Sequence, residues 1–347
     1  MTGKIDIIIR PLVFILLATI LCGIVFEISG FSAILMFNSI LEGAFFGSRS
    51  LEKSLRWALP LFITAVGVGI SFRCGFFNIG AQGQFYIGTV CAVYVTEYMS
   101  GVQAVIVIPL GMIAGMAGGA LWSLWPGYLK LRYGVDEVIT TLMSNFIAGL
   151  ILVYVTSGPL KDQSGSGQQA STKILPSELR ISDANGVSPT IIAITITVGI
   201  FGWLLVNRTS FGTLSSLAGR NPTMLKYQGG KIWQLGLASF IICGMLAGLS
   251  GSIELFGPTG RVVSGFLPTH GFTAILVALV ASYAVIGTAF SALFFGGLFS
   301  AALFLPIFTG LPTSAIDLFN AIIALLITAR ITLGKNFLGN LWNRNHD

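Results

Sequence analysis

The chain has little charge and few histidines and cysteines. Only 9% of its 347 residues are charged, and it contains two histidines and four cysteines. The cysteines lie singly in apolar segments without a Cys-x-x-Cys pair, and the histidines are far apart, so neither a disulfide framework nor a metal site is indicated. Hydrophobic residues make up 54% of the chain, which excludes an ordinary soluble domain. This composition predicts an all-α, polytopic transmembrane helical bundle.

Several functional motifs are also missing. The sequence has no Gly-x-x-x-x-Gly-Lys-Ser/Thr phosphate loop, so we do not expect the chain to hydrolyse ATP. No nucleophile, base and metal ligands gather in one segment, which disfavours a membrane-embedded enzyme and predicts no catalytic residue and no cofactor. The formal net charge is +6, but the basic residues are spread over short loops rather than gathered in a patch. A nucleic-acid partner is therefore not expected.

Apolar stretches of about 20 residues, the length that crosses a bilayer, predict about ten spans, some of them broken helices. We expect them at 11–28, 57–72, 76–96, 102–124, 138–157, 189–206, 232–253, 271–286, 288–308 and 315–329. The first is interpreted as a retained helix, because no small-residue cleavage site precedes a soluble mature domain. Residues 271–308 would be nearly twice too long for one span at about 1.5 Å per residue, and a break is expected at Gly287.

The distribution of basic residues predicts the orientation. With a cytoplasmic N-terminus, twelve of the 19 Lys and Arg residues fall inside, which favours a cytoplasmic location for both termini. The loop at about 158–188 is then external, and a short helix is expected after Pro176. The loop at about 207–231 is cytoplasmic and carries four cations and no acid. We treat residues 1–347 as a single transmembrane domain.

The segment from Phe76 to Gln84 places amides and glycines inside an apolar stretch. Asn78, Gln82 and Gln84 need hydrogen-bond partners within the protein, and the glycines favour a break in the helix. These amides can hold helices together, or they can border a polar pathway; the residues alone leave both interpretations open. Asn145, about two turns into a later apolar helix, is a second candidate for the pathway.

A short helix with its own capping residues is predicted inside the cytoplasmic loop. Asn221 can cap it, Pro222 suits its first position, and Gly229 or Gly230 can end it in a left-handed conformation. Such a helix suits docking to a soluble subunit, and an interfacial helix held on anionic membrane lipid by its cations is the alternative.

Two acids and a set of glycines suggest roles outside the solute pathway, in ion coupling and in helix packing. Glu254 and Asp317 lie near the predicted outer ends of helices, and an acid in a membrane is a candidate proton carrier. Small-x-x-x-small spacings at 111–119 and 244–248 indicate close helix packing rather than ligand binding.

Four ordered motifs carry a family resemblance. They are Phe77–Gln84, Asp136–Asn145, Gly219–Gly230 and Gly244–Gly251. In order and spacing they resemble the permease subunits of bacterial ATP-binding-cassette importers, in the nucleoside and simple-sugar branch that is related to ribose and branched-chain amino acid permeases. Members of the nucleoside branch often have Glu where this chain has Gln82.

The resemblance implies a function and a set of partners. The chain would form the translocation pathway for a small polar solute, a nucleoside or simple sugar, with a separate ATPase subunit, a second and homologous permease, and an extracytoplasmic substrate-binding protein, in the bacterial inner membrane. The substrate pathway would include Asn78, Gln82, Gln84 and Asn145. ATPase coupling would use Arg220, Asn221, Pro222, Lys226, Tyr227, Gly229 and Gly230. The alternative is a proton- or sodium-coupled secondary transporter that uses Glu254 or Asp317.

Overall fold

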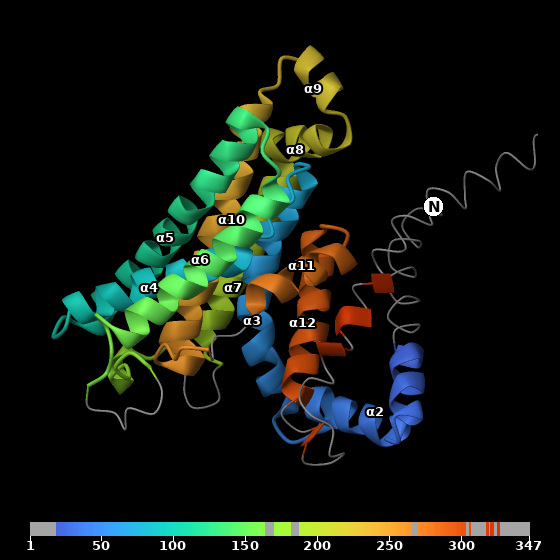
Figure 1. The fold of residues 1–347 in the computed structure, drawn as a ribbon, viewed down its shortest axis with the longest axis vertical. Helices are drawn as coiled ribbons and strands as arrows, with labels where there is room; N and C mark the ends of the chain where they lie inside the picture. Colours follow the sequence, from blue (N-terminus) through green and yellow to red (C-terminus); the bar gives the residue numbers. More distant parts are fainter. Residues whose placement is uncertain are drawn as a thin grey trace, which may run out of the picture. The chain divides into compact units, whose positions relative to one another are not determined.

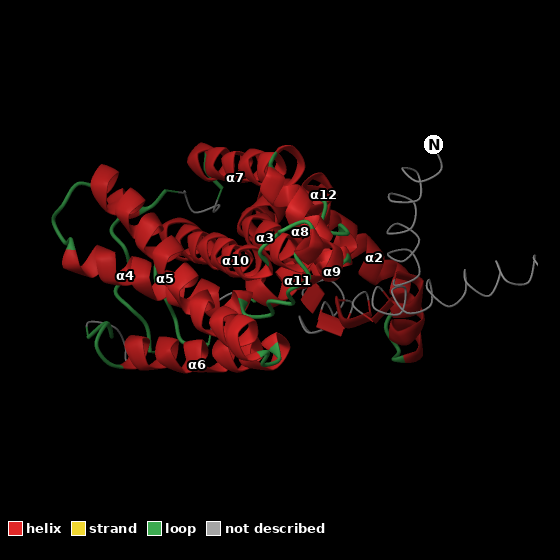
Figure 2. Ribbon diagram, turned by 90° about the horizontal axis from the view of Figure 1, so that it is seen from above, coloured by secondary structure: helices red, strands yellow, loops and turns green. Residues whose placement is uncertain are grey.

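The computed structural model describes residues 19–163, 170–181, 187–265, 269–302, 305–306, 317–318, 320–322 and 325–326. These residues form helices and connecting segments, and no strand occurs among them beyond one isolated antiparallel bridge between Ser171 and Val263. The all-α class is therefore confirmed (Figure 2). The chain divides into two compact units, Leu55–Gly296 and the combination of Met1–Ser54 with Gly297–Asp347.

The larger unit contains the helices that matter for function. They are most of α3 (Ser50–Arg73), α4 (Ala81–Tyr98), α5 (Ala104–Tyr133), α6 (Glu137–Ser157), α7 (Pro189–Arg208), α8 (Ser210–Arg220), α9 (Pro222–Tyr227), α10 (Ile232–Glu254), η3 (Leu255–Thr259), α11 (His270–Val280) and most of α12 (Val285–Ala302). Within this unit, α8 and α9 lie at one end, and η3 with the loop that follows α6 lies at the opposite end (Figure 1). Helices α6 and α7 flank α10 on opposite sides (Figure 2).

Glycines bring the backbones of α4, α5 and α10 into direct contact at several points. A Cβ atom added to Gly88 of α4 would lie 2.3 Å from the Cα atom of Gly248 in α10, and one added to Gly119 of α5 would lie 2.2 Å from the carbonyl oxygen of Gly244. Such distances leave room only for glycine, because the backbones themselves are in contact. The prediction that the small-residue spacings mean close packing is confirmed.

Six helices in the described part of the chain are long and apolar enough to cross a membrane: α3, α5, α6, α7, α12 and the continuous segment Ile232–Thr259. Helix α4 has 18 residues but carries polar side chains and is not among them. The predicted count of about ten is not confirmed and stays a prediction. Its last span, 315–329, lies mostly outside the described residues, and the first span, 11–28, is described only from Thr19.

The predicted break at Gly287 is wrong. Helix α11 ends at Val280 and α12 begins at Val285, so Gly287 lies inside a helix. The turn is made by Ser282 and Tyr283, whose φ angles are 50° and 64°. Since side chains rarely adopt this left-handed conformation, a glycine was the natural expectation, and the structure turns without one.

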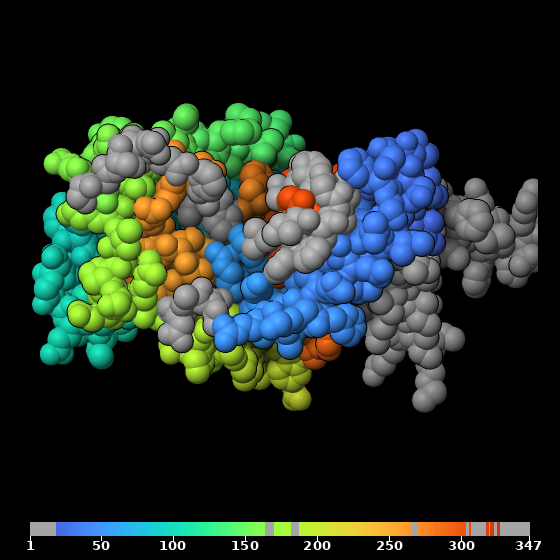
Figure 3. All heavy atoms as spheres, turned by 90° about the horizontal axis from the view of Figure 1, so that it is seen from below, coloured from blue at the N-terminus to red at the C-terminus, as the bar shows by residue number. Residues whose placement is uncertain are grey.

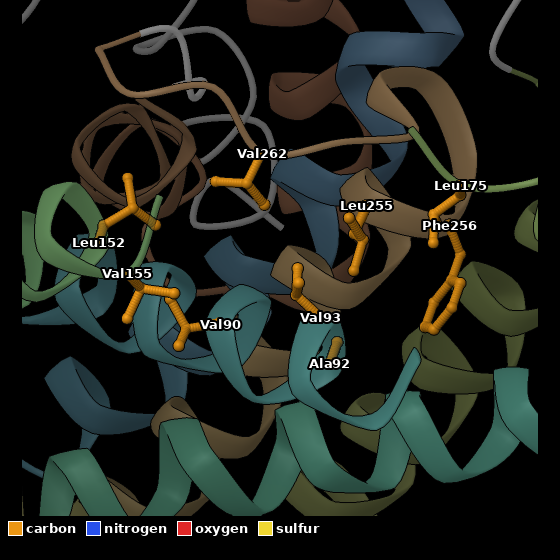
Figure 4. Packing of buried hydrophobic residues seen from close by; sticks show 9 residues of the cluster. All are labelled: Val90, Ala92, Val93, Leu152, Val155, Leu175, Leu255, Phe256 and Val262. Atoms are coloured by element: carbon orange, nitrogen blue, oxygen red, sulfur yellow. The ribbon is translucent and has the colours of Figure 1, made fainter. Parts of the chain in front are cut away.

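The loop after α6 folds back over the ends of the helices. Leu175 of this loop packs with residues of α4, α6 and η3 in a buried apolar cluster, which also contains Val262 from the segment after η3 (Figure 4). In the space-filling view, the yellow-green residues of this loop lie against the orange residues that follow α10 (Figure 3). The short helix expected after Pro176 is present as the 3₁₀ turn Ser177–Leu179.

The smaller unit is described in part. It contains a helix at Thr19–Ile28, α2 (Ala33–Leu41) and the π-helix η1 (Glu42–Phe46). The hydroxyl of Ser54 donates to the carbonyl oxygen of Ala44 at 2.6 Å, and that of Ser300 donates to the carbonyl oxygen of Gly43 at 2.9 Å. These bonds satisfy buried hydroxyls and tie the ends of α3 and α12 to η1.

Candidate functional site

The chain between α3 and α4 is not helical, and Asn78 organises it. Gly75 has a φ of +83°, which ends the continuation of α3. The side-chain oxygen of Asn78 accepts from the backbone N–H of Gly80 at 2.9 Å and from the amide of Gln84 at 3.2 Å. Asn78 thereby supplies an acceptor at the start of α4, where backbone N–H groups lack helical partners.

Helix α6 supplies the remaining partners of this segment. The side-chain oxygen of Asn145 accepts from the N–H of Gly83 at 2.7 Å, and its amide donates to the carbonyl oxygen of Ile79 at 2.9 Å. The hydroxyl of Thr141 accepts from the N–H of Ile79 at 3.2 Å. The break that the sequence predicts near Gly80 is therefore stabilised by side chains of a neighbouring helix, as a broken backbone within a membrane requires.

Gln82 connects α4 to the start of α11. Its side-chain oxygen accepts from the backbone N–H of Gly271 at 2.7 Å. The approach is close, since a Cβ atom on Gly271 would lie 2.2 Å from the backbone nitrogen of Gln82. Four predicted pathway residues thus gather around the first turns of α4, and all are at most 4% exposed: Asn78, Gln82, Gln84 and Asn145. Their proximity is established; their role in transport remains a prediction.

A buried charged cluster lies beside these amides, and sequence reasoning did not find it. One terminal nitrogen of Arg56 in α3 contacts a carboxylate oxygen of Glu254 at 2.9 Å, and His270 Nε2 lies 3.6 Å from the other oxygen. The Arg56 guanidinium lies 3.8 Å from the centre of the Trp57 ring. Glu254 and His270 are fully buried. The sequence places Glu254 near the end of a helix, and no local pattern pairs it with an arginine 198 positions away.

The amino-terminal end of α6 holds a second pair of charges. Asp136 caps the helix, since its carboxylate accepts from the N–H of Val138 at 2.8 Å. Glu137 forms an ion pair with Lys130 at 2.5 Å and accepts from the N–H of Phe77 at 3.4 Å. Glu137 therefore does more than complement the helix dipole, because it connects the end of α5 to the broken segment.

The predicted short helix in the loop at 207–231 is present as α9. Asn221 Oδ1 accepts from the N–H of Met224 at 2.9 Å, Pro222 occupies the first turn, and Gly229 has a φ of +76°. Leu225 is buried against α8 and α10. The outward side chains include Met224, 47% exposed, and Tyr227, 88% exposed. The predicted coupling residues Arg220, Asn221, Pro222, Lys226, Tyr227 and Gly229 are exposed, and Gly230 is half-buried.

Helix α8 contacts the start of the broken segment directly. Arg73 Nε donates to the hydroxyl of Ser216 at 2.7 Å. A Cβ atom on Gly219 would lie 2.4 Å from the carbonyl oxygen of Arg73, and one on Gly75 would lie 3.0 Å from the Cα atom of Gly219. The α8–α9 pair is therefore joined through backbone contact to the segment that carries Asn78.

Comparisons with known proteins agree with this arrangement. A family model described as branched-chain amino acid transport system / permease component matches residues 50–329. The chain is 30% identical to a guanosine ABC transporter permease protein of Bacillus subtilis (strain 168), over 96% of this chain and 98% of that protein. It is 28% identical to a nucleoside ABC transporter permease protein of Lactococcus lactis subsp. cremoris, over 96% of this chain and 94% of that protein.

A further relative is a glucose ABC transporter permease protein of Haloferax volcanii, 27% identical over 80% of this chain and 75% of that protein. No solved structure matches the chain. The family implies a separate ATPase subunit and a substrate-binding protein as partners, and the permease itself is not an enzyme. The chain belongs to the permease family of ABC transport systems that is named for branched-chain amino acid uptake, and it is a multi-pass membrane protein.

Proposed function

We propose that this permease subunit forms, with a second and homologous permease, the pathway by which a bacterial inner-membrane importer takes up a nucleoside. The observation that carries the proposal is the set of buried amides around the start of α4, since polar groups at a broken helix are typical of solute pathways in membranes. Two relatives with nearly full-length matches are named for guanosine and nucleoside transport. The surplus of basic residues on one side supports a cytoplasmic location for both termini.

The proposed coupling route begins at α9. An ATPase subunit bound to the exposed residues of 220–230 would displace α8 and α9 when it closes around ATP. Because α8 contacts Arg73 and Gly75, this displacement would act on the segment that leads to Asn78. Affinity for the solute would reside mainly in the external binding protein, and this chain would supply the route.

A simple sugar is the second candidate solute, since one relative is named for glucose.

The rival mechanism, a secondary transporter driven by protons or sodium, has less support. The matching family and the relatives with nearly full-length matches are ABC permeases, and Asp317 is exposed on its helix. An ion-coupling acid is expected to face the interior of the bundle or a water-filled cavity, which the exposed Asp317 does not.

The test is uptake into proteoliposomes that contain the permeases and the ATPase, with the purified binding protein outside the vesicles. We expect uptake of labelled nucleosides to require ATP inside the vesicles, where the ATPase subunits lie. The rate of uptake should not change when proton and sodium gradients are collapsed. The control is an ATPase whose phosphate-loop lysine is replaced. Uptake driven by an ion gradient without the ATPase would contradict the proposal, and uptake of sugars alone would replace the nucleoside with a sugar.

A further inference from the structure

The charged cluster of Arg56, Glu254 and His270 is built from three separate helices. Arg56 comes from α3, Glu254 ends α10, and His270 begins α11. The side chains of Glu254 and His270 are 0% exposed, and that of Arg56 is 18% exposed. The rings of Trp57 and Phe85 each lie edge-on to the imidazole at 5.7 Å between centroids. Charged and aromatic groups therefore converge on one point inside the larger unit.

This cluster has hydrogen-bonding capacity that its own members do not use. Within the described part of the chain, four of its buried atoms have no partner within hydrogen-bond distance: Arg56 Nη1, Glu254 Oε2, His270 Nδ1 and His270 Nε2. Glu254 Oε2 and His270 Nε2 face each other at 3.6 Å, and Arg56 Nη1 and His270 Nδ1 face neither of them. Buried polar atoms are almost always paired, and an unpaired set in a membrane protein calls for a functional explanation. A cluster that served packing alone would be better built from apolar side chains.

The free groups define the chemistry of a ligand. A carboxylate oxygen accepts hydrogen bonds and a guanidinium nitrogen donates them. A neutral imidazole donates a hydrogen bond from one ring nitrogen and accepts one at the other. Because the positive and negative charges offset each other, a neutral molecule fits better than an ion. A nitrogenous base carries adjacent donors and acceptors on one planar edge. Its flat ring can also pack against aromatic side chains such as those of Trp57 and Phe85.

The cluster adjoins the proposed pathway. Gln82 binds the backbone of Gly271, the residue after His270, so the amides and the charges meet at the first turn of α11. Helix α11 has 11 residues, or about 16 Å, which is too short to span a bilayer. The turn that follows it contains the left-handed residues Ser282 and Tyr283. Half-helices of this kind commonly present their ends to transported solutes.

We infer that Arg56, Glu254 and His270 form a recognition site in the permease for the base of the transported nucleoside, an inference that rests on the proposed function. In the present structure the side chains occupy the site themselves. As the pathway opens, Arg56 and Glu254 would separate and the base would bind between them. Glu254 would then accept hydrogen bonds from N–H groups of the base, and Arg56 would donate to acceptors of the base. The site would make passage depend on the hydrogen-bonding edge of the solute.

The test compares transport of guanosine and inosine, which differ only in an exocyclic amine that Glu254 can accept from. The complete importer is reconstituted with Glu254→Gln, and initial uptake rates are measured at saturating binding protein. We expect the guanosine-to-inosine rate ratio to change by at least about fivefold, since the neutral amide oxygen of Gln accepts a hydrogen bond more weakly than a carboxylate does. Glu254→Asp should restore the ratio of the unchanged importer. The matched control is Glu97→Gln, an exposed acid in the same unit.

A second variant keeps the test decisive if Glu254→Gln does not assemble. Arg56→Gln combined with Glu254→Gln removes both charges together and leaves no unpaired buried ion, and it should change the ratio in the same direction. If both variants slow guanosine and inosine by the same factor, the cluster is structural and the inference fails while the proposed function stands. If the unchanged importer carries no nucleoside, the proposed function fails and the inference falls with it.

Discussion

Gln82 and Gly271 are joined by a hydrogen bond of 2.7 Å, from the backbone nitrogen of Gly271 to the side-chain oxygen of Gln82. This bond links the first turn of α4 to the first turn of α11, 189 positions later in the chain. The N–H of Gly271 belongs to a helix amino terminus, where no backbone acceptor is available within the helix. Gln82 is therefore both a candidate pathway residue and a structural acceptor, and the two roles can be separated by mutation.

Gln82→Leu should lower transport. The substitution keeps the approximate size of the side chain but removes the acceptor, which leaves a buried N–H unpaired at a cost of about 1–3 kcal/mol. Gln82→Glu keeps an acceptor and should retain most of the activity. The measurement is the initial uptake rate, with the affinity for the binding protein and the yield of assembled complex as controls.

Cysteine substitution should show whether the amides border the pathway. Cysteines placed at positions 78 and 82 should react with a small water-soluble thiol reagent in at least one nucleotide state of the importer. Both positions are buried in the present structure, so the reaction is expected in the state that opens the pathway. Inert cysteines in every state, together with normal transport by Gln82→Leu, would show that the amides serve only to hold the helices together.

Valine at positions 229 and 230 should uncouple ATP hydrolysis from transport. Gly229 has a φ of +76°, where a side chain costs about 1–2 kcal/mol, and a Cβ atom on Gly230 would lie 2.3 Å from a methyl carbon of Leu225. We expect normal membrane insertion with little stimulation of ATP hydrolysis by the loaded binding protein. Gly101→Val is the matched control, since Gly101 has a φ of +87° in the turn between α4 and α5. Stimulation equal to that of the unchanged complex would contradict the coupling role.

Alanine at Gly88 should destabilise the larger unit. A Cβ atom there would lie 2.3 Å from the Cα atom of Gly248, and overpacking of this kind costs about 1–3 kcal/mol. The added methyl group at Gly149 would meet only a ring carbon of Tyr86 at 3.9 Å, so Gly149→Ala should be neutral or slightly stabilising. The thermal midpoint of the purified complex in detergent measures both. A midpoint for Gly88→Ala that matches Gly149→Ala would rule out the tight contact.

Asp317→Asn should leave uptake unchanged, because the side chain is exposed and no transport role is assigned to it. The residual uptake of Glu254→Gln should still require ATP and should ignore a collapsed proton or sodium gradient. Both rates are measured in the same proteoliposomes. If either substitution abolished a dependence on an ion gradient, the secondary-transporter mechanism would regain support.

The sequence predicts the features that depend on local residue types. Asn221, Pro222 and Gly229 predict a short capped helix because each suits one position of it, and the helix α9 has those residues where expected. Asn78 and Gln82 predict a break near Gly80 because amides and glycines in an apolar stretch have few other uses, and the segment before α4 is indeed not helical.

Features that depend on distant partners could not be predicted. Arg56 and Glu254 look like separate residues near helix ends, and only the packing of α3 against α10 brings them together. The turn after α11 was also missed, since Ser282 and Tyr283 adopt a left-handed conformation without the glycine that would have marked it. In both cases the tertiary contacts override what the local sequence favours.

The glycine contacts among α4, α5 and α10 bear on how the importer moves. Where a neighbouring helix touches the backbone at a glycine, no flexible side chain lies between them that can yield. Sliding by even a fraction of a turn would therefore force backbone atoms into one another at these points. These three helices should therefore behave as one stiff lever. A displacement of α8 and α9 at one end of these helices would therefore tilt them as a unit, and the tilt would move the end that carries η3. Access to the solute would alternate because the three helices rock together, not because they bend.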